Sequence, residues 1–407
     1  MFNIQQTRRV RYEIHSKVGD RWRLDAVVED ARGMAERLVG GGGALDDIES
    51  AAVERANTLL ATGTIAAVKV VRERLRDDGF STAREIFFRE AEARPEAPPS
   101  VSPLDAPAPL CAAPEELSTR PACRVVSNVL RSFLDKLSVT PLELLHFHPY
   151  QRKLSDNHTL LQGALHQIAA AQARATGEKP AERLRALQKL VDAAESRARE
   201  IQALRLPLFQ GDFAAFAARV AAASGEGDRR FFLFAAIARH LQGGSAFMAK
   251  LEFALAALAA APNDPWSRGC LDEFAAGCLD DPQTVGELLG RRRNLADALL
   301  ALARLATGRL PQGEAGAPAT VGQLSAFLRG GTLPLSAEAL WERVSRELRR
   351  NRPLCRNDST MEWPTLLRLR DTLPQECPAD VRPAVEGAIQ ERIRRHRADG
   401  GRGAAAS

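Results

Sequence analysis

The sequence has few of the features that mark an exported or disulfide-stabilised protein. Its 407 residues include only six cysteines, and none of them forms a CxxC pair. Cys270 and Cys278 lie on one predicted helix, where eight positions span about 12 Å along the axis, too far for a disulfide. We therefore expect reduced thiols and a cytoplasmic protein.

Long hydrophobic runs are also missing. The longest ones, FFLFAAIA at 231–238 and FALAALAAAP at 253–262, fall short of the roughly 18 residues that a membrane span needs. The N-terminal residues MFNIQQTRRVRYEIHSK contain no apolar core of a signal peptide. The sequence therefore predicts a soluble chain without a membrane span.

Neither an excess of charge nor a catalytic motif is present. The 56 basic residues are interleaved with 51 acidic ones, which gives a formal charge of only +5 and a mixed, solvated surface. GxSxG, HExxH, the P-loop, the Rossmann GxGxxG and the EF-hand loop are all absent. We therefore expect a non-enzymatic protein with no catalytic residue and no cofactor.

Residues 1–92 are predicted to form a small α+β domain. Apolar and charged residues alternate in RVRYEIHS and RWRLDAVV, which indicates two half-buried strands with Trp22, Leu24 and Ala26 on one face. The turn residues KVGD between them predict a hairpin. Further along, helical stretches and two β-rich runs around Asp78-Gly79 indicate helices on one face of an antiparallel sheet; they lie at 31–39, 44–61, 64–74 and 81–90.

A proline-rich segment follows this domain. Eight prolines occur between Pro95 and Pro121, among Ala, Ser and Glu. Such a composition cannot hold a helix or a central strand, so we expect an extended, semi-rigid linker over 93–121.

Residues 122–398 are predicted to form a large α-helical domain, so that the whole chain is mostly α. Helical spacing recurs in about ten stretches, which indicates an irregular bundle or array, and 399–407 is expected to be a disordered tail. Residues 209–274 hold nine of the 16 phenylalanines. We interpret these as packing residues, the alternative being an aromatic pocket for a ligand.

The stretch LLHFHPYQRKLSDNH at 144–158 raises the question of a metal site. In a helix beginning after Thr140, His146 and His148 are about 200° apart and cannot both reach one ion. Pro149 ends that helix, and the next one is expected to begin with Ser155 or Asp156 as its cap. We interpret the stretch as a helix junction; the residues that a metal site would use are His146, His148, His158 and Cys123.

Arginine is concentrated in the last third of the chain. Guanidinium groups suit phosphates and carboxylates, although aromatic residues for base stacking are not interleaved with them. The candidate residues for an anionic partner are Arg291, Arg292, Arg293, Arg349, Arg350, Arg394 and Arg395.

Together these features predict a cytoplasmic scaffold or regulatory adaptor that binds partner proteins through its helical domain and its small N-terminal module. Two alternatives stay open: a nucleic-acid-associated regulator that uses the C-terminal arginines, and a ligand sensor or enzyme with a pocket in the Phe-rich core. The partner and the oligomeric state do not follow from the sequence.

Overall fold

The computed structural model divides the chain into two compact units, Met1–Pro98 and Pro99–Ser407. Its described residues are 9–18, 21–29, 43–61, 66–75, 81–90, 98–104, 107–204, 206–243, 246–260, 264–290, 292–310, 319–355 and 359–404. The helix predicted at 31–39 lies outside these ranges.

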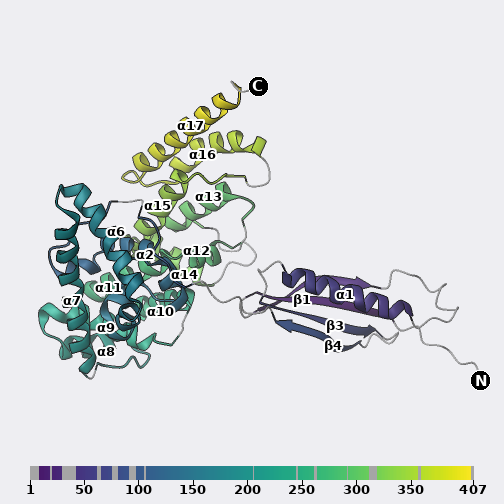
Figure 1. Cartoon of the computed structure of the whole chain (residues 1–407), viewed down its shortest axis with the longest axis horizontal. Helices are drawn as coiled ribbons and strands as arrows, with labels where there is room; N and C mark the ends of the chain where they lie inside the picture. The colour runs from purple at the N-terminus through teal and green to yellow at the C-terminus, as the bar shows by residue number, and fades with distance from the viewer. Residues whose placement is uncertain are drawn as a thin grey trace, which may run out of the picture. The chain divides into compact units, whose positions relative to one another are not determined.

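The N-terminal unit contains a four-stranded antiparallel sheet and one described helix (Figure 1). The strands lie in the order β2-β1-β3-β4, and the predicted hairpin is confirmed by the pairing of β1 with β2. Helix α1 covers one face, where Ala52 and Ala56 pack against Tyr12, Ile14 and Val70. The elements are β1 (Arg9–Val18), β2 (Arg21–Glu29), α1 (Gly43–Ala61), β3 (Ala67–Leu75) and β4 (Ser81–Glu90).

A β-bulge changes which residues of β2 face α1. Ile14 pairs with Ala26 while His15 pairs with Leu24, so Asp25 is the extra residue of the bulge. Directly paired residues share a face, and a slip by one residue moves every later side chain to the opposite face. Ala26 therefore faces the helix with Ile14, whereas Leu24 lies on the other face. The prediction that Trp22, Leu24 and Ala26 share one face is wrong.

Much of the proline-rich segment packs on the helical unit. Ser102 donates its backbone N–H to Val129 O, and Leu104 donates to the Gln167 side chain. Val101, Leu104 and Ala108 pack into an apolar cluster with α2 (Arg120–Val129), α3 (Arg131–Leu137) and α6 (His158–Thr176). The described residues 99–104 and 107–121 therefore belong to the helical unit, although their sequence favours an extended, semi-rigid linker.

The helical unit confirms the predicted helical array. Sixteen α-helices are described in it, more than the ten expected, because several have only six to eight residues and fall below the length that periodicity detects. Their bounds are α2 (Arg120–Val129), α3 (Arg131–Leu137), α4 (Pro141–His146), α5 (His148–Ser155), α6 (His158–Thr176), α7 (Pro180–Ala203), α8 (Phe213–Ala223), α9 (Arg229–His240), α10 (Phe247–Ala260), α11 (Pro265–Leu279), α12 (Pro282–Leu289), α13 (Leu295–Ala306), α14 (Ala319–Arg329), α15 (Pro334–Arg349), α16 (Glu362–Glu376) and α17 (Arg382–Ala404).

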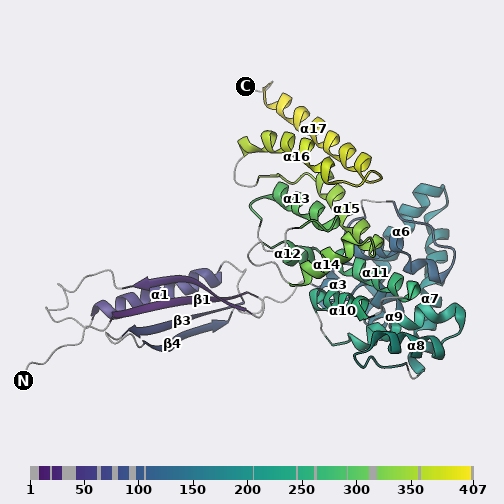
Figure 2. The ribbon, with the colours of Figure 1, turned by 180° about the vertical axis from the view of Figure 1, so that it is seen from behind.

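Neighbouring helices of this array pack in pairs. Helix α6 lies against α7, α10 against α11, and α16 against α17 at the C-terminal end of the unit (Figure 1, Figure 2). Helix α15 contacts α11, α13 and α17 and so links the middle of the unit to its end. Helix α17 runs on to Ala404, beyond the end predicted at 398, and residues 405–407 lie outside the described ranges.

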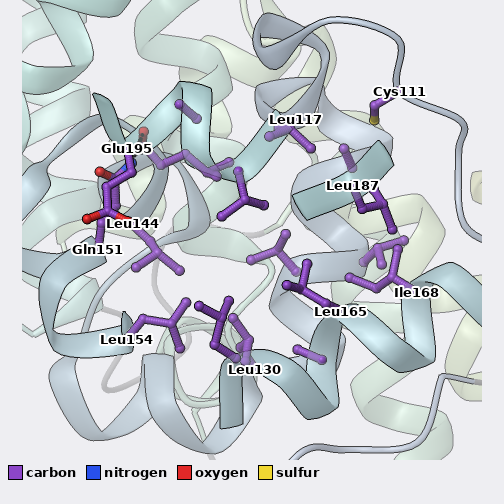
Figure 3. Close-up of a pocket in the computed structure, with 18 of the residues that line it drawn as sticks. Cys111, Leu117, Leu130, Leu144, Gln151, Leu154, Leu165, Ile168, Leu187 and Glu195 are labelled. Carbon is purple, nitrogen blue, oxygen red and sulfur yellow. Dashed lines mark hydrogen bonds between the residues drawn. The ribbon is translucent and has the colours of Figure 1, made fainter. Parts of the chain in front are cut away.

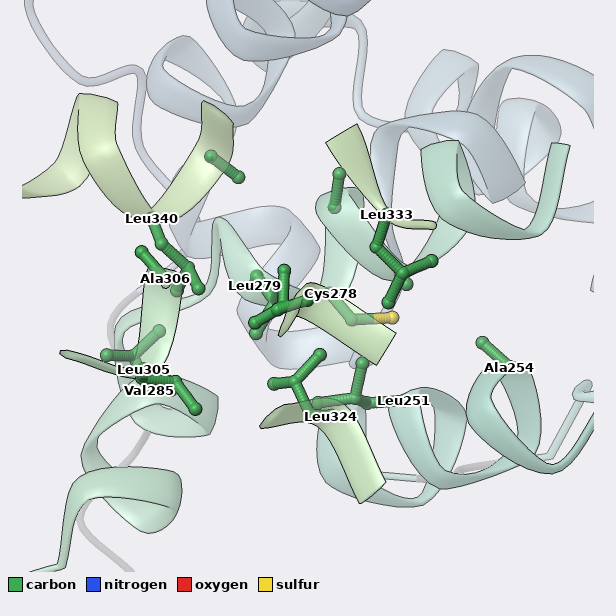
Figure 4. Close-up of a cluster of buried hydrophobic side chains, with 14 of the residues drawn as sticks. Leu251, Ala254, Cys278, Leu279, Val285, Leu305, Ala306, Leu324, Leu333 and Leu340 are labelled. Carbon is green, nitrogen blue, oxygen red and sulfur yellow. The ribbon is translucent and has the colours of Figure 1, made fainter. Parts of the chain in front are cut away.

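One large apolar cluster joins α8 to α17. Leucines and alanines from α10 to α15 meet at its centre, together with Cys278 (Figure 4). Phe213, Phe216, Phe234 and Phe274 are buried in the same cluster, so these phenylalanines of the 209–274 segment are packing residues. Cys270 and Cys278 both lie on α11 as predicted, and all six cysteines are free thiols.

A buried ion pair ties α10 to α4. Lys250 Nζ lies 2.6 Å from Glu143 Oε1 and donates to Ser138 O at 2.6 Å, and both side chains are only 1% exposed. The other oxygen of Glu143 accepts from the backbone N–H of Thr140 and completes a capping box at the start of α4. This confirms Thr140 as the predicted cap, with Pro141 in the first turn.

Candidate functional site

The sheet face opposite α1 exposes large apolar side chains, and we call it the outer face. The register places Trp22 beside Lys17, Leu24 beside His15, Val27 beside Glu13 and Phe88 beside Lys69, all on this face. The exposed fractions are large for such residues: Trp22 38%, Leu24 48%, Val27 42% and Phe88 49%. Single exposed apolar residues are ordinary, but several on one face make that face a candidate interaction surface.

Two aromatic side chains of the outer face lie close together. The rings of Trp22 and Phe88 lie 6.2 Å apart between centroids, and Lys69 Nζ lies 4.7 Å from the Trp22 ring centroid. This cation–π contact holds the lysine stem along the apolar surface while its ammonium group stays available. Trp and Phe are enriched at the centres of protein interfaces, so the composition favours a protein partner.

The charges on the outer face are of both signs. Arg11 pairs with Glu13 at 3.0 Å and with Glu73 at 2.5 Å. Among the described residues, neither Lys17 nor Lys69 forms an ion pair. A face on which acidic and basic groups are balanced attracts phosphate backbones only weakly, because affinity for them needs clustered positive charge.

The four candidate metal ligands lie on four different helices. His146 ends α4, His148 begins α5, His158 is exposed in the first turn of α6, and Cys123 lies on α2. No group of three or more His, Cys, Asp or Glu side chains within the described ranges could hold a metal ion.

The junction contains a helix that the sequence does not predict. Pro149 lies in the first turn of α5, which begins at His148, and the preceding helix α4 already ends at His146, with Phe147 extended. Proline is favoured in a first helical turn, where its missing N–H has no partner to lose. The next helix is flanked by Asn157, so the prediction of Ser155 or Asp156 as its cap is wrong.

His146 is fully enclosed. Its Nδ1 donates to Leu142 O at 2.7 Å, and its ring centroid lies 4.5 Å from that of Phe231 and 5.1 Å from that of Phe234. Burial, together with the positive charges of Arg230 and Arg197, lowers the pKa of His146 to about 3, against the opposing effect of the Leu142 carbonyl. The imidazole is therefore neutral in the folded protein at neutral pH.

The structure brings two of the arginine clusters together, at the contact between α15 and α17. Arg395 donates to Leu348 O at 3.4 Å, and Arg350 donates to Glu347 at 2.8 Å. Arg394, Arg349 and Arg293 are exposed.

At the third cluster, Arg292 donates to Leu289 O, and Arg291 lies outside the described residues. Several of the seven arginines thus bond to carbonyls and carboxylates of their own unit, and the hypothesis of an anionic partner stays a prediction.

An apolar cavity of about 110 Å³ lies between α2, α4, α5, α6 and α7 (Figure 3). Its walls are mainly leucine, valine and alanine, and none of its lining residues belongs to the Phe-rich segment in which the sequence placed the alternative pocket. Figure 3 shows Gln151 and Glu195 together at one side and Cys111 at the other. Burial raises the pKa of the Cys111 thiol, which therefore stays protonated at neutral pH.

Sequence reasoning missed the residues that form the outer face and the cavity. Ala26, Val27 and Val28 are consecutive apolar residues, as are Ile86, Phe87 and Phe88, and strict alternation cannot place such runs on one face. These runs were the available signal that both faces of the sheet carry apolar side chains. Nothing in the sequence distinguishes Gln151 from other polar residues at helix junctions.

Comparison of the chain with protein-family models, with curated proteins and with solved structures finds no match. None of the described helices is long and apolar enough to cross a membrane.

Proposed function

We propose that the protein is an adaptor that binds a partner protein on the outer face of its N-terminal sheet. The observation that carries the proposal is the exposure of Trp22, Leu24, Val27 and Phe88 on one face of a sheet whose other face is covered by α1. Burying such side chains is worth about 25 cal/mol per Å² of apolar surface, and aromatic residues dominate the binding energy of many interfaces.

The chemistry of the face supports a partner of one kind. Apolar side chains on the partner would cover the Trp22 and Phe88 rings, and carboxylates at the edge of the contact would meet Lys69 and Lys17. Because Arg11 is already paired with Glu13 and Glu73, it contributes little additional charge. We therefore expect a protein segment with apolar and acidic residues, and only a modest dependence of its affinity on salt.

The proposal is tested by affinity enrichment from native extract with the full-length protein. The paired variants are Leu24→Ser and Phe88→Ser, and the matched control is Leu208→Ser, which changes a somewhat more exposed leucine (56%) in the helical unit. We expect a defined set of proteins that the wild type and the control retain and that both outer-face variants lose by tenfold or more. Equal retention by all four proteins would disprove the proposal.

The nucleic-acid alternative predicts a different result in the same experiment. Retained nucleic acid would be released between low and moderate salt, and retention would depend on Arg349 and Arg394 rather than on Leu24. Protein retention that depends on the outer face at moderate salt supports the adaptor instead.

A further inference from the structure

The cavity in the helical unit has the dimensions of a ligand site. An engineered apolar cavity of about 150 Å³ stays dry and binds benzene, so the cavity of about 110 Å³ has room for an apolar body of about four to six carbon atoms. Leu144, Leu165 and Leu187 are among the residues that line it. An apolar ligand there would replace an empty space with packing contacts.

One polar atom on the cavity wall has no partner. The Gln151 side chain is only 9% exposed, and its Nε2 donates to Leu145 O at 2.8 Å. Because a carbonyl can only accept, this bond fixes which end of the amide is nitrogen. The amide oxygen Oε1 is therefore a buried acceptor, and it has no donor among the described residues. Buried acceptors are rarely left unpaired, so this atom points to a missing donor.

Other acceptor oxygens lie at the same side of the cavity. Ser155 Oγ donates to Glu195 Oε2 at 3.4 Å, and Glu195 Oε1 accepts from the exposed Arg199 at 3.4 Å. The Glu195 side chain is 24% exposed, so this side is close to solvent. A ligand at this side would meet one negative charge and several acceptors.

A second glutamine on the wall serves as an internal comparison. Gln172 donates through Nε2 to Pro109 O, and its Oε1 accepts from Arg183 Nε at 2.8 Å. Both ends of its amide are thus paired within the protein. Of these two glutamines, Gln151 is the one with an unpaired amide oxygen, and it lies at the same side of the cavity as Glu195.

We propose that this cavity binds a small primary amine with an apolar body of about four to six carbon atoms. The ammonium group donates a hydrogen bond to Gln151 Oε1. The Glu195 carboxylate balances its charge, because the pair of Glu195 with Arg199 is weak: the Arg199 side chain is 63% exposed. Hydrogen bonds to charged groups are the stronger ones, and they favour a cation over a neutral molecule of the same shape. A carboxylate ligand is excluded, because it would meet acceptors and a like charge.

The test uses the full-length protein with labelled Leu and Val methyl groups and three probes of one shape: cyclopentylamine, cyclopentane and cyclopentanecarboxylate. We expect cyclopentylamine to cause saturable NMR shifts of Leu144, Leu165 and Leu187 methyl groups and to bind at least tenfold more tightly than cyclopentane. No binding is expected for the carboxylate. The proposal fails if the amine causes no saturable shift, or if either other probe binds as tightly.

Two variants test the polar side of the cavity. Gln151→Met keeps the volume but removes the acceptor, and it should weaken cyclopentylamine about tenfold or more while leaving cyclopentane unchanged. If that variant does not fold, Glu195→Gln removes the charge and should weaken the amine by a similar factor, whereas Glu200→Gln on the exposed side of α7 should not. Unchanged amine affinity in Glu195→Gln would overturn the assignment. The outcome is independent of Leu24→Ser, which lies in the other unit.

Discussion

Acidification should destabilise the helical unit through one buried histidine. His146 is enclosed by Phe231 and Phe234, and its pKa in the folded protein is about 3, against an ordinary value of 6.5. Between these two values the unfolded chain binds a proton at His146 that the folded chain does not bind. The unfolded state is therefore favoured as the pH falls from 6.5 towards 3.

The magnitude follows from the two pKa values. Within this window one proton taken up on unfolding lowers the free energy of unfolding by about 1.4 kcal/mol for each pH unit. Over the whole window the loss is about 5 kcal/mol, which is comparable with the total stability of many domains. Above pH 6.5 His146 is neutral in both states and contributes no pH dependence.

The assay is urea unfolding followed by circular dichroism at several pH values from 4.5 to 7. His146→Phe keeps an uncharged ring among the phenylalanines, and His158→Gln, at an exposed histidine on α6, is the matched control. We expect the free energy of unfolding of the wild type and of the control to fall as the pH is lowered. This fall should be steeper than that of His146→Phe by about 1.4 kcal/mol per pH unit. Equal slopes for all three proteins would refute the reasoning.

Three further substitutions test the packing of the helical unit by the same urea assay. Lys250→Met should cost about 3–5 kcal/mol, because it leaves Glu143 buried without a counter-charge; a loss below 1 kcal/mol would mean that the pair is solvated. Gly308→Ala should be far more destabilising than Gly331→Ala, although φ is +66° at both positions. The reason is that a Cβ at 308 would clash with Ser325 O and lie 2.6 Å from Arg329 N, whereas a Cβ at 331 would not. Similar losses at both glycines would contradict the packing described around Gly308.

The hairpin, α1 and most long helices could be predicted from the sequence because their signals are local. Alternation in β1 and the apolar stripes of the helices are patterns of the chain itself. The packing of the proline-rich segment on the helical unit could not be predicted from its composition. Proline disfavours helix and strand, but it does not prevent an extended segment from packing. Its contacts, such as Ser102 N with Val129 O, are made with residues distant in the sequence.

The candidate sites depended on features that single-sequence patterns do not contain. The bulge at Asp25 moves Trp22 and Leu24 to the outer face, and its position depends on pairing with β1. The cavity beside Gln151 depends on how α5 and α7 pack, although Thr140 and Pro141 correctly predicted where α4 begins. The cap of α4 could be predicted from the sequence, whereas the space left between packed helices could not.

The most direct test of the adaptor proposal is site-specific photo-crosslinking in cells. A crosslinking amino acid replaces Leu24 on the outer face or, as the control, Leu208 in the helical unit. The proposal predicts a discrete crosslinked protein from position 24 that disappears when Phe88→Ser is added, and no such product from position 208. An absence of any product from position 24, or the same product from both positions, would contradict it.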